Sequence, residues 1–158
     1  MSYFHRYKAL NDLAIYWYFW KTSKSCKYYE SHKAMDNVLI CFPFIPNVNK
    51  ISKIHTAYNY PYWAGEIPYC HCNSINHFMT VDEIFSHNRK YRKVYWNDKI
   101  YKYSKEEFIA FIKSNKLEYT FLWDTKTFPD NEKNLRFGIK LRLNKIYKKL
   151  SCFGQFMK

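Results

Sequence analysis

The segment from residue 93 to residue 115 constrains the fold most, because a strand signal leads directly into a helix signal. Two short runs rich in aromatic and β-branched residues, 93–96 and 99–103, flank the pair Asn97 and Asp98. Asn and Asp tolerate the positive φ angles that a two-residue hairpin turn requires. The pattern therefore predicts a β-hairpin at these residues.

A capped helix is predicted directly after the hairpin. Ser104 and Glu107 fit a capping box, in which each side chain accepts a hydrogen bond from the other residue's backbone N–H. Phe108 and Phe111 begin an apolar stripe at helical spacing. The stripe predicts a helix that ends at Asn115.

The remaining regular elements are predicted from the same two periodicities. A second capping box, at Thr80 and Glu83, indicates a helix that ends near Arg89. Strict alternation over 135–143, in which apolar residues alternate with Arg136, Gly138, Lys140 and Arg142, is typical of a half-buried strand. We also expect helices over about 8–21 and 143–150, and strands at 37–43 and 118–124.

The long stretch from Pro43 to Cys72 shows neither period and is predicted to be an irregular crossing. Helical and strand signals alternate on both sides of it. This mixture predicts an α+β fold with a largely antiparallel sheet and three to four helices. We expect one domain over residues 1–158, with 144–158 as a basic C-terminal helix or tail.

The charge of the chain indicates an anionic partner. Its 26 Lys and Arg residues exceed its 13 Asp and Glu residues and leave a net charge of +13. Such a charge attracts polyanions at long range. Biased codon usage in an AT-rich genome, which favours Lys, explains part of the excess.

Positive charge is concentrated near the C-terminus. Every charged side chain after Glu132 is Lys or Arg, and no acidic residue follows that position. Residues two apart on a strand lie ~6.6 to 7 Å apart on one face, which is similar to the spacing of phosphates along a nucleic acid strand. The alternative is a solvated sheet face that only promotes solubility. The predicted phosphate-binding residues in this basic row are Arg136, Lys140, Arg142, Lys145, Lys148 and Lys149.

A second predicted nucleic-acid-binding cluster, Arg89, Lys90, Arg92 and Lys93, surrounds Tyr91. Aromatic side chains beside cations suit single-stranded nucleic acid, because each base offers a face for stacking. The sequence thus predicts a non-enzymatic nucleic-acid-binding protein, an accessory of a nucleoprotein complex in an AT-rich phage, parasite or organelle. RNA is favoured over DNA, because exposed aromatics suit unpaired bases.

The aromatic residues within the irregular crossing support an alternative partner. Tyr60, Tyr62 and Trp63 are candidate contacts to another protein, because aromatics are enriched in interface hot spots. In this interpretation the chain is a viral or mobile-element factor that inhibits a host defence nuclease.

An enzymatic alternative depends on the run 120–126, a predicted strand that ends in Asp-x-Lys. This run resembles the metal-binding element of PD-(D/E)xK nucleases. The resemblance implies that Asp98 and Asp124 hold a divalent cation and that Lys126 stabilises the phosphate charge. The predicted helix between the two carboxylates departs from the usual arrangement of that family, and both aspartates also fit as ordinary turn residues.

Cys70, Cys72, His77 and His87 are candidate zinc ligands by residue type. Their spacing fits a zinc site poorly, because a Cys-x-Cys pair differs from the usual knuckle and no second pair is evident. The alternative is a set of ordinary half-buried residues. We predict no cofactor.

The cysteine content indicates a reducing compartment. Five cysteines without framework spacing, and an N-terminus without signal-peptide features, predict an intracellular protein of the cytoplasm or an organelle matrix. The longest apolar run, Leu13 to Trp20, is shorter than the ~20 residues that span a bilayer. No membrane association is expected. Cys26, Cys41 and Cys152 are predicted to be buried small apolar residues, and His32 gives no signal.

Overall fold

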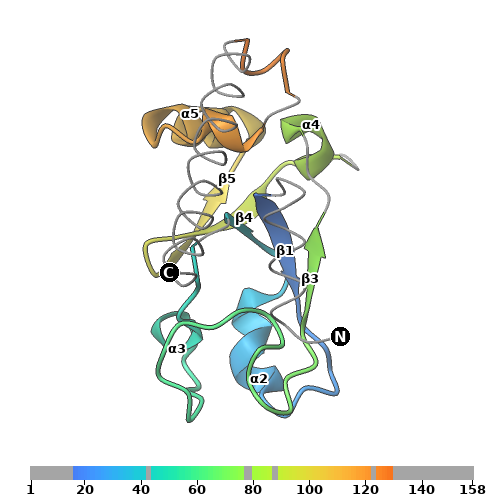
Figure 1. Ribbon diagram of the computed structural model, residues 1–158, viewed down its shortest axis with the longest axis vertical. Coiled ribbons are helices and arrows are strands. Elements are labelled where there is room, and N and C mark those ends of the chain that lie inside the picture. Colours follow the sequence, from blue (N-terminus) through green and yellow to red (C-terminus); the bar gives the residue numbers. More distant parts are fainter. Residues whose placement is uncertain (1–15, 42–43, 77–79, 87–88, 122–123, 130–158) are drawn as a thin grey trace, which may run out of the picture.

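Five strands form one sheet at the centre of the molecule (Figure 1). The computed structural model describes residues 16–41, 44–76, 80–86, 89–121 and 124–129. The elements are β1 (Trp17–Lys21), α2 (Tyr29–His32), the 3-10 helix η1 (Lys33–Met35), β2 (Val38–Cys41), α3 (Val48–Ile51), β3 (Asn73–Asn76), α4 (Val81–Ile84), β4 (Arg92–Trp96), β5 (Lys99–Tyr103), α5 (Lys105–Ser114) and the 3-10 helix η2 (Glu118–Thr120).

The strand order is β3-β1-β2-β4-β5, and three of the four pairings are antiparallel. The pairing of β2 with β4 is parallel, which places Val38 beside Lys93. Parallel neighbours need a crossover connection, and residues 42–91 supply it. The predicted α+β fold with a largely antiparallel sheet is confirmed.

Both faces of the central strands are buried. In β1, Trp17 and Phe19 face one side while Tyr18 and Trp20 face the other. The helix-side core combines the first face with α4, α5 and η2. The loop-side core combines the second face with α2, α3 and the irregular segment 52–72. Figure 1 shows α4 and α5 at one end of the molecule and α2 and α3 at the other.

The hairpin and the capped helix form as the sequence predicts. Asn97 and Asp98 have φ angles of 47° and 61° at the turn between β4 and β5. The Ser104 hydroxyl accepts from the Glu107 amide at 3.2 Å, and the helix α5 has Asn115 as its C-cap. The strand predicted at 37–43 is confirmed as β2.

Two predicted elements are wrong within the described residues. Residues 17–21 of the predicted helix 8–21 form strand β1, because a strand buried on both faces reads as a continuous apolar run and not as an alternating one. In place of the strand predicted at 118–124, η2 forms at 118–120, where the Thr120 hydroxyl binds the Leu117 carbonyl.

The segment after β2 is more regular than predicted. It contains the short helix α3, and it ends in the edge strand β3, which the sequence analysis missed. The Thr80 capping box is present, but α4 ends at Ile84, well before Arg89. The predicted strand 135–143, helix 143–150 and C-terminal tail lie outside the described residues.

In the described part of the chain, no helix has both the length and the apolar character needed to span a membrane.

Candidate nucleic-acid interface and a buried cysteine-histidine cluster

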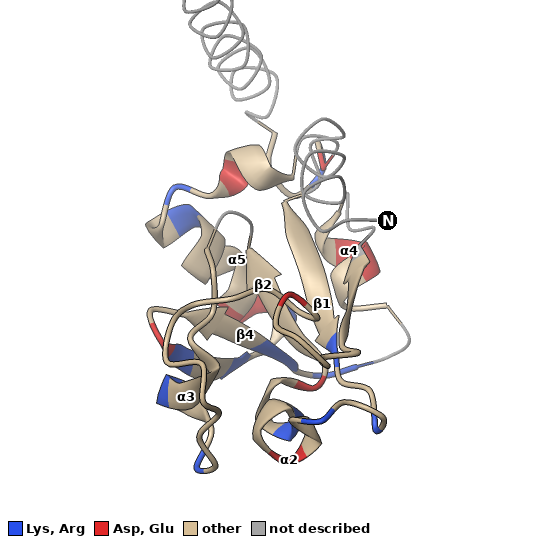
Figure 2. Cartoon of the chain, turned by 60° about the horizontal axis from the view of Figure 1, so that its bottom comes forward, with Lys and Arg blue, Asp and Glu red and all other residues tan. Residues whose placement is uncertain are grey.

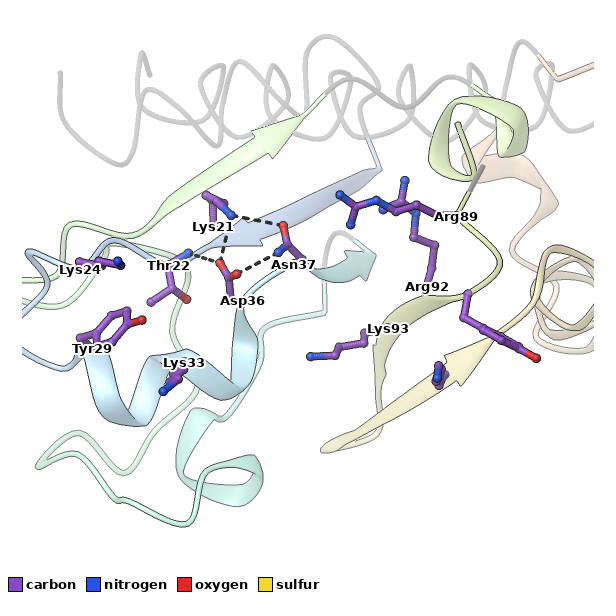
Figure 3. Close-up of a pocket in the computed structure, with 12 residues that line it drawn as sticks. Lys21, Thr22, Lys24, Tyr29, Lys33, Asp36, Asn37, Arg89, Arg92 and Lys93 are labelled. Atoms are coloured by element: carbon purple, nitrogen blue, oxygen red, sulfur yellow. Dashed lines mark hydrogen bonds and ion pairs between the residues drawn. The ribbon is translucent and has the colours of Figure 1, made fainter. Parts of the chain in front are cut away.

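An open cleft of about 610 Å³ lies at one end of the central strands (Figure 3). One wall comes from the end of β1 and from α2 with its flanking turns, and the other comes from β4 and β5. Figure 2 shows basic residues in the segments that flank α2 and along β4. The basic residues that line the cleft are Lys21, Lys24, Lys33, Arg89, Arg92, Lys93 and Lys102.

One carboxylate, that of Asp36, lies among these cations. Its oxygens accept from the Thr22 amide at 3.0 Å and the Asn37 side chain at 2.9 Å, and Lys21 lies 3.5 Å away. Among the residues that the structure describes, the other six cations of the cleft form no ion pair. The cleft therefore carries a large positive charge that the described residues leave uncompensated.

Of the cations that the structure describes in the cleft, Arg92 alone is buried, with 8% of its surface exposed. Its guanidinium lies 4.9 Å from the centre of the Phe19 ring, and its Nε donates to the Ile84 carbonyl. Burial lowers the pKa of Arg92, and the positive charge of Arg89 lowers it further. Arg89 and Arg92 thus place like charges at the same cleft, which favours an anion near them.

Like charges also face each other across the hairpin. Lys93 and Lys102 are direct partners in the register of β4 and β5, an arrangement that destabilises a sheet when no anion is near. The Tyr91 ring is 41% exposed and lies 4.7 Å from the Lys102 ammonium and 5.4 Å from that of Lys90. The cleft therefore combines cations with an accessible aromatic face.

The structure brings the predicted cluster at 89–93 into this cleft, where Arg89, Arg92 and Lys93 line the wall. The sequence analysis missed four further basic residues of the cleft, because they are scattered along the chain and only the sheet pairing unites them. The predicted basic row after Glu132 lies outside the described residues. The four missed residues are Lys21, Lys24, Lys33 and Lys102.

The aromatic residues proposed for a protein partner differ in exposure. Tyr60 is 49% exposed, whereas Tyr62 is fully buried and Trp63 is 8% exposed. Tyr62 and Trp63 are part of the loop-side core. Of the three predicted contacts, only Tyr60 presents a large part of its side chain to solvent.

The carboxylates of the nuclease alternative have separate structural roles. Asp98 accepts from Tyr95 Oη at 2.8 Å and binds Lys50 at the hairpin turn. Asp124 is buried and accepts from the Val81 amide at 2.9 Å, at the first turn of α4. Lys126 is exposed. Among the described residues, these carboxylates belong to no group of three or more metal-ligating side chains.

A different set of side chains forms a compact cluster in the loop-side core. The sulfur atoms of Cys26, Cys70 and Cys72 and one ring nitrogen of His32 all lie within 4.8 Å of one another. The distances from His32 Nδ1 to the three sulfurs are 3.5, 3.5 and 3.3 Å. All four residues are buried. We refer to them as the Cys3His cluster.

Two turns and one helix position the Cys3His cluster. Cys26 closes a turn through a bond from its amide to the Ser23 carbonyl, and His32 lies in α2. The amide of Cys70 binds the Ile67 carbonyl in a second turn. Tyr69 adopts a positive φ of 60° in that turn, a strained conformation that the surrounding contacts must hold in place.

The three sulfurs of the cluster differ in how readily they carry negative charge. Burial raises the pKa of Cys26, and hydrogen bonds with the backbone of Tyr28 and His71 oppose that rise. The Cys70 thiol donates to Cys72, which lowers the pKa of Cys72 and raises that of Cys70. At least one sulfur of the cluster is therefore suited to being a thiolate.

Half of this cluster is predicted from the sequence. Cys70 and Cys72 were candidate ligands, whereas Cys26 and His32 were not, because a spacing of five residues between a Cys and a His fits no common knuckle. His77 and His87 lie outside the described residues. The prediction that Cys26 and Cys41 are buried is confirmed.

Comparisons with protein-family models, with curated proteins and with solved structures found no match.

Proposed function

We propose that this protein binds nucleic acid, with RNA as the preferred class, through the basic cleft between α2 and β4. The observation that carries the proposal is the gathering, among the described residues, of seven cations around one carboxylate, which is itself held by neighbouring groups. A folded chain has no structural need for this arrangement, because each like-charge contact costs stability. A phosphate backbone would offset that cost by neutralising the cations.

The two aromatic residues of the cleft favour unpaired bases over a duplex. Tyr91 is exposed between two ammonium groups, and Tyr29 lines the opposite wall with Lys33 above its ring at 6.0 Å. Stacking of a base on such a ring contributes about 1 to 3 kcal/mol in single-stranded complexes.

Fluorescence anisotropy with labelled single-stranded and double-stranded RNA and DNA of one length tests this proposal. We expect the tightest binding to single-stranded RNA and an affinity that falls linearly with salt on logarithmic axes. Affinity independent of salt would contradict binding through phosphates.

A matched pair of variants separates the cleft from the overall charge. Lys102→Gln and Lys99→Gln each remove one exposed cation from β5, but only Lys102 lines the cleft. Lys102→Gln should weaken binding and reduce the salt slope by about 0.7, the value for one phosphate contact with a single strand. Lys99→Gln should leave both unchanged. Equal effects of the two substitutions would show that only net charge matters.

Two rival partners give different outcomes in related experiments. The volume of the cleft also lies in the range of small-ligand sites. Full competition by a mononucleotide would indicate a small ligand instead of a polymer. A protein complex that persists after nuclease treatment and is lost in Tyr60→Ala would favour the interaction-protein alternative.

A further inference from the structure

We propose that the Cys3His cluster binds one zinc ion and that this ion cross-links α2 to the segment that precedes β3. The proposal is independent of nucleic-acid binding. Its ligands are the sulfur atoms of Cys26, Cys70 and Cys72 and the Nδ1 atom of His32.

The spacing of the four atoms fits a single tetrahedral ion. Zn–S bonds of ~2.3 Å and Zn–N bonds of ~2.0 to 2.1 Å place the nitrogen about 3.6 Å from each sulfur in a tetrahedron. His32 Nδ1 lies 3.3 to 3.5 Å from the three sulfurs, close to that value. The mutual limit of 4.8 Å for all four atoms leaves room for one ion between them.

Ordinary hydrogen bonding explains this geometry less well. A neutral imidazole nitrogen has one lone pair and can accept one good hydrogen bond, yet three sulfur atoms surround the Nδ1 of His32. One cation can bond to all four atoms at once. The three thiols would lose their protons to solvent as three Zn–S bonds form.

The surroundings of His32 also suit a metal ligand. Tyr62 Oη lies 3.0 Å from Nε2, on the far side of the ring. With its proton on Nε2, the ring donates to Tyr62 and directs the Nδ1 lone pair at the sulfurs. Such a hydrogen-bond partner orients a metal-binding histidine, and its loss typically lowers metal affinity by about 10- to 100-fold. His32 and Tyr62 are both fully buried, which fixes this arrangement.

Zinc is the metal that the ligand set favours. Three sulfurs with one nitrogen in a tetrahedron are typical of structural zinc sites, where four protein ligands leave no open position for substrate. Burial of all four ligands agrees with a closed site. The ligands come as two pairs from separate segments, Cys26 with His32 and Cys70 with Cys72, as in many structural sites.

Metal analysis of the untagged full-length protein gives the first test. We expect about one zinc per chain after purification without chelators. After the zinc is exchanged for Co²⁺, the protein should show the visible bands of a tetrahedral site and the near-ultraviolet charge transfer of cobalt–thiolate bonds. Absence of bound zinc together with absence of these cobalt bands would overturn the proposal. A disulfide among the three cysteines, found by alkylation and mass spectrometry, would also overturn it.

Two tyrosine variants test the site without removing a ligand. Tyr62→Phe keeps the ring but removes the bond to His32, so zinc affinity should fall by about 10- to 100-fold. Tyr95→Phe is the control, because Tyr95 is buried in the same core and its hydroxyl binds Asp98 instead. Equal zinc affinity of Tyr62→Phe and Tyr95→Phe would contradict the proposed role of Tyr62 and His32.

Removal of one zinc-binding side chain should have the largest effect on zinc binding. Cys72→Ser should lose bound zinc and the cobalt–thiolate absorption. Cys41→Ser changes a buried cysteine outside the cluster and should keep both. If Cys72→Ser does not fold, the cobalt spectrum of the wild-type protein and Tyr62→Phe still decide the question.

Discussion

The two cores of this protein are held together by different means. In the helix-side core, Trp17, Phe108 and Phe121 contact one another with ring centres 5.3 to 6.1 Å apart. The loop-side core lies under one-turn helices and irregular chain, and it buries polar side chains such as His32 and Asn49. On the helix side, the ten-residue helix α5 covers the sheet and contributes Phe108 and Phe111 to the core. Irregular chain needs specific polar contacts, and here we propose a metal ion.

Removal of zinc should affect the two cores unequally, and this is the largest effect that we expect. After chelation, backbone amides of α2 should lose protection from hydrogen exchange by about 100-fold or more, because structural zinc contributes directly to folding. Amides of α5 should keep most of their protection. Equal loss in both helices, measured by hydrogen exchange with mass spectrometry, would show that the cores are one cooperative unit.

Truncation of Phe108 should destabilise the protein without altering the metal site. This fully buried side chain packs against Trp17 and Phe121, so Phe108→Ala should lower the free energy of unfolding by about 3 to 5 kcal/mol. Urea denaturation measures the change. The control Phe44→Ala removes a side chain that is 37% exposed and should cost far less. Loss of zinc in folded Phe108→Ala would contradict the separation of the cores.

Removal of a single hydrogen bond in the helix-side core should lower the stability of the protein by an intermediate amount. Trp17 Nε1 donates to Thr120 Oγ1 at 2.8 Å in a buried position. Thr120→Val keeps the shape but leaves the indole N–H without this acceptor, at a cost of about 1 to 3 kcal/mol. Thr125→Val, at an exposed site, serves as the control. Thermal unfolding of the two variants should differ, and similar midpoints would show that the bond is unimportant.

The smallest effect on stability is expected from removal of the Asp98 charge at the hairpin turn beside the loop-side core. Lys50 is the main cause that lowers the pKa of Asp98 below its ordinary 3.8, and the Tyr95 hydroxyl adds to it. Asp98 therefore contributes stability above pH 3.8, and this contribution is lost as the pH falls through the lower folded pKa.

Asp98→Asn isolates this contribution, because Asn tolerates the positive φ at that position. The Asp98 side chain is 38% exposed, so water screens the pair and the loss at pH 7 should be about 0.5 kcal/mol or less. Denaturation at pH 7 and in strong acid should show that the difference between variant and wild type disappears in acid. A difference that persists in acid would assign the effect to packing instead of charge.

Local signals in the sequence were sufficient to predict part of the fold. The Ser104 capping box and the Asn97–Asp98 turn act within a few residues, and both predictions are confirmed. Strand β1 was missed because burial on both faces, which hides its alternation, is a property of the assembled sheet. Edge strand β3 depends on pairing with β1, and its own residues, Asn73–Asn76, carry little strand propensity.

The same distinction applies to the candidate sites. Cations at 89–93 are adjacent in sequence and were found as a cluster, whereas Lys21 and Lys33 reach the cleft only through the pairing of β1, β2 and β4. Cys70 and Cys72 were noticed as neighbours, but Cys26 and His32 join them across about 40 residues of chain. No spacing rule covers ligands whose separation is set by an irregular loop.

The parallel pairing of β2 with β4 has a consequence for how this protein tolerates change in length. A connection as long as 42–91 has to bring two strands together against chain entropy, although that cost rises only slowly with length. The contacts of residues 70 and 72 with residues 26 and 32 divide the connection into two shorter loops. Extra residues inserted at the exposed stretch 53–55 should therefore be accommodated, whereas the same insertion between Cys72 and β3 would shift the register of the edge strand.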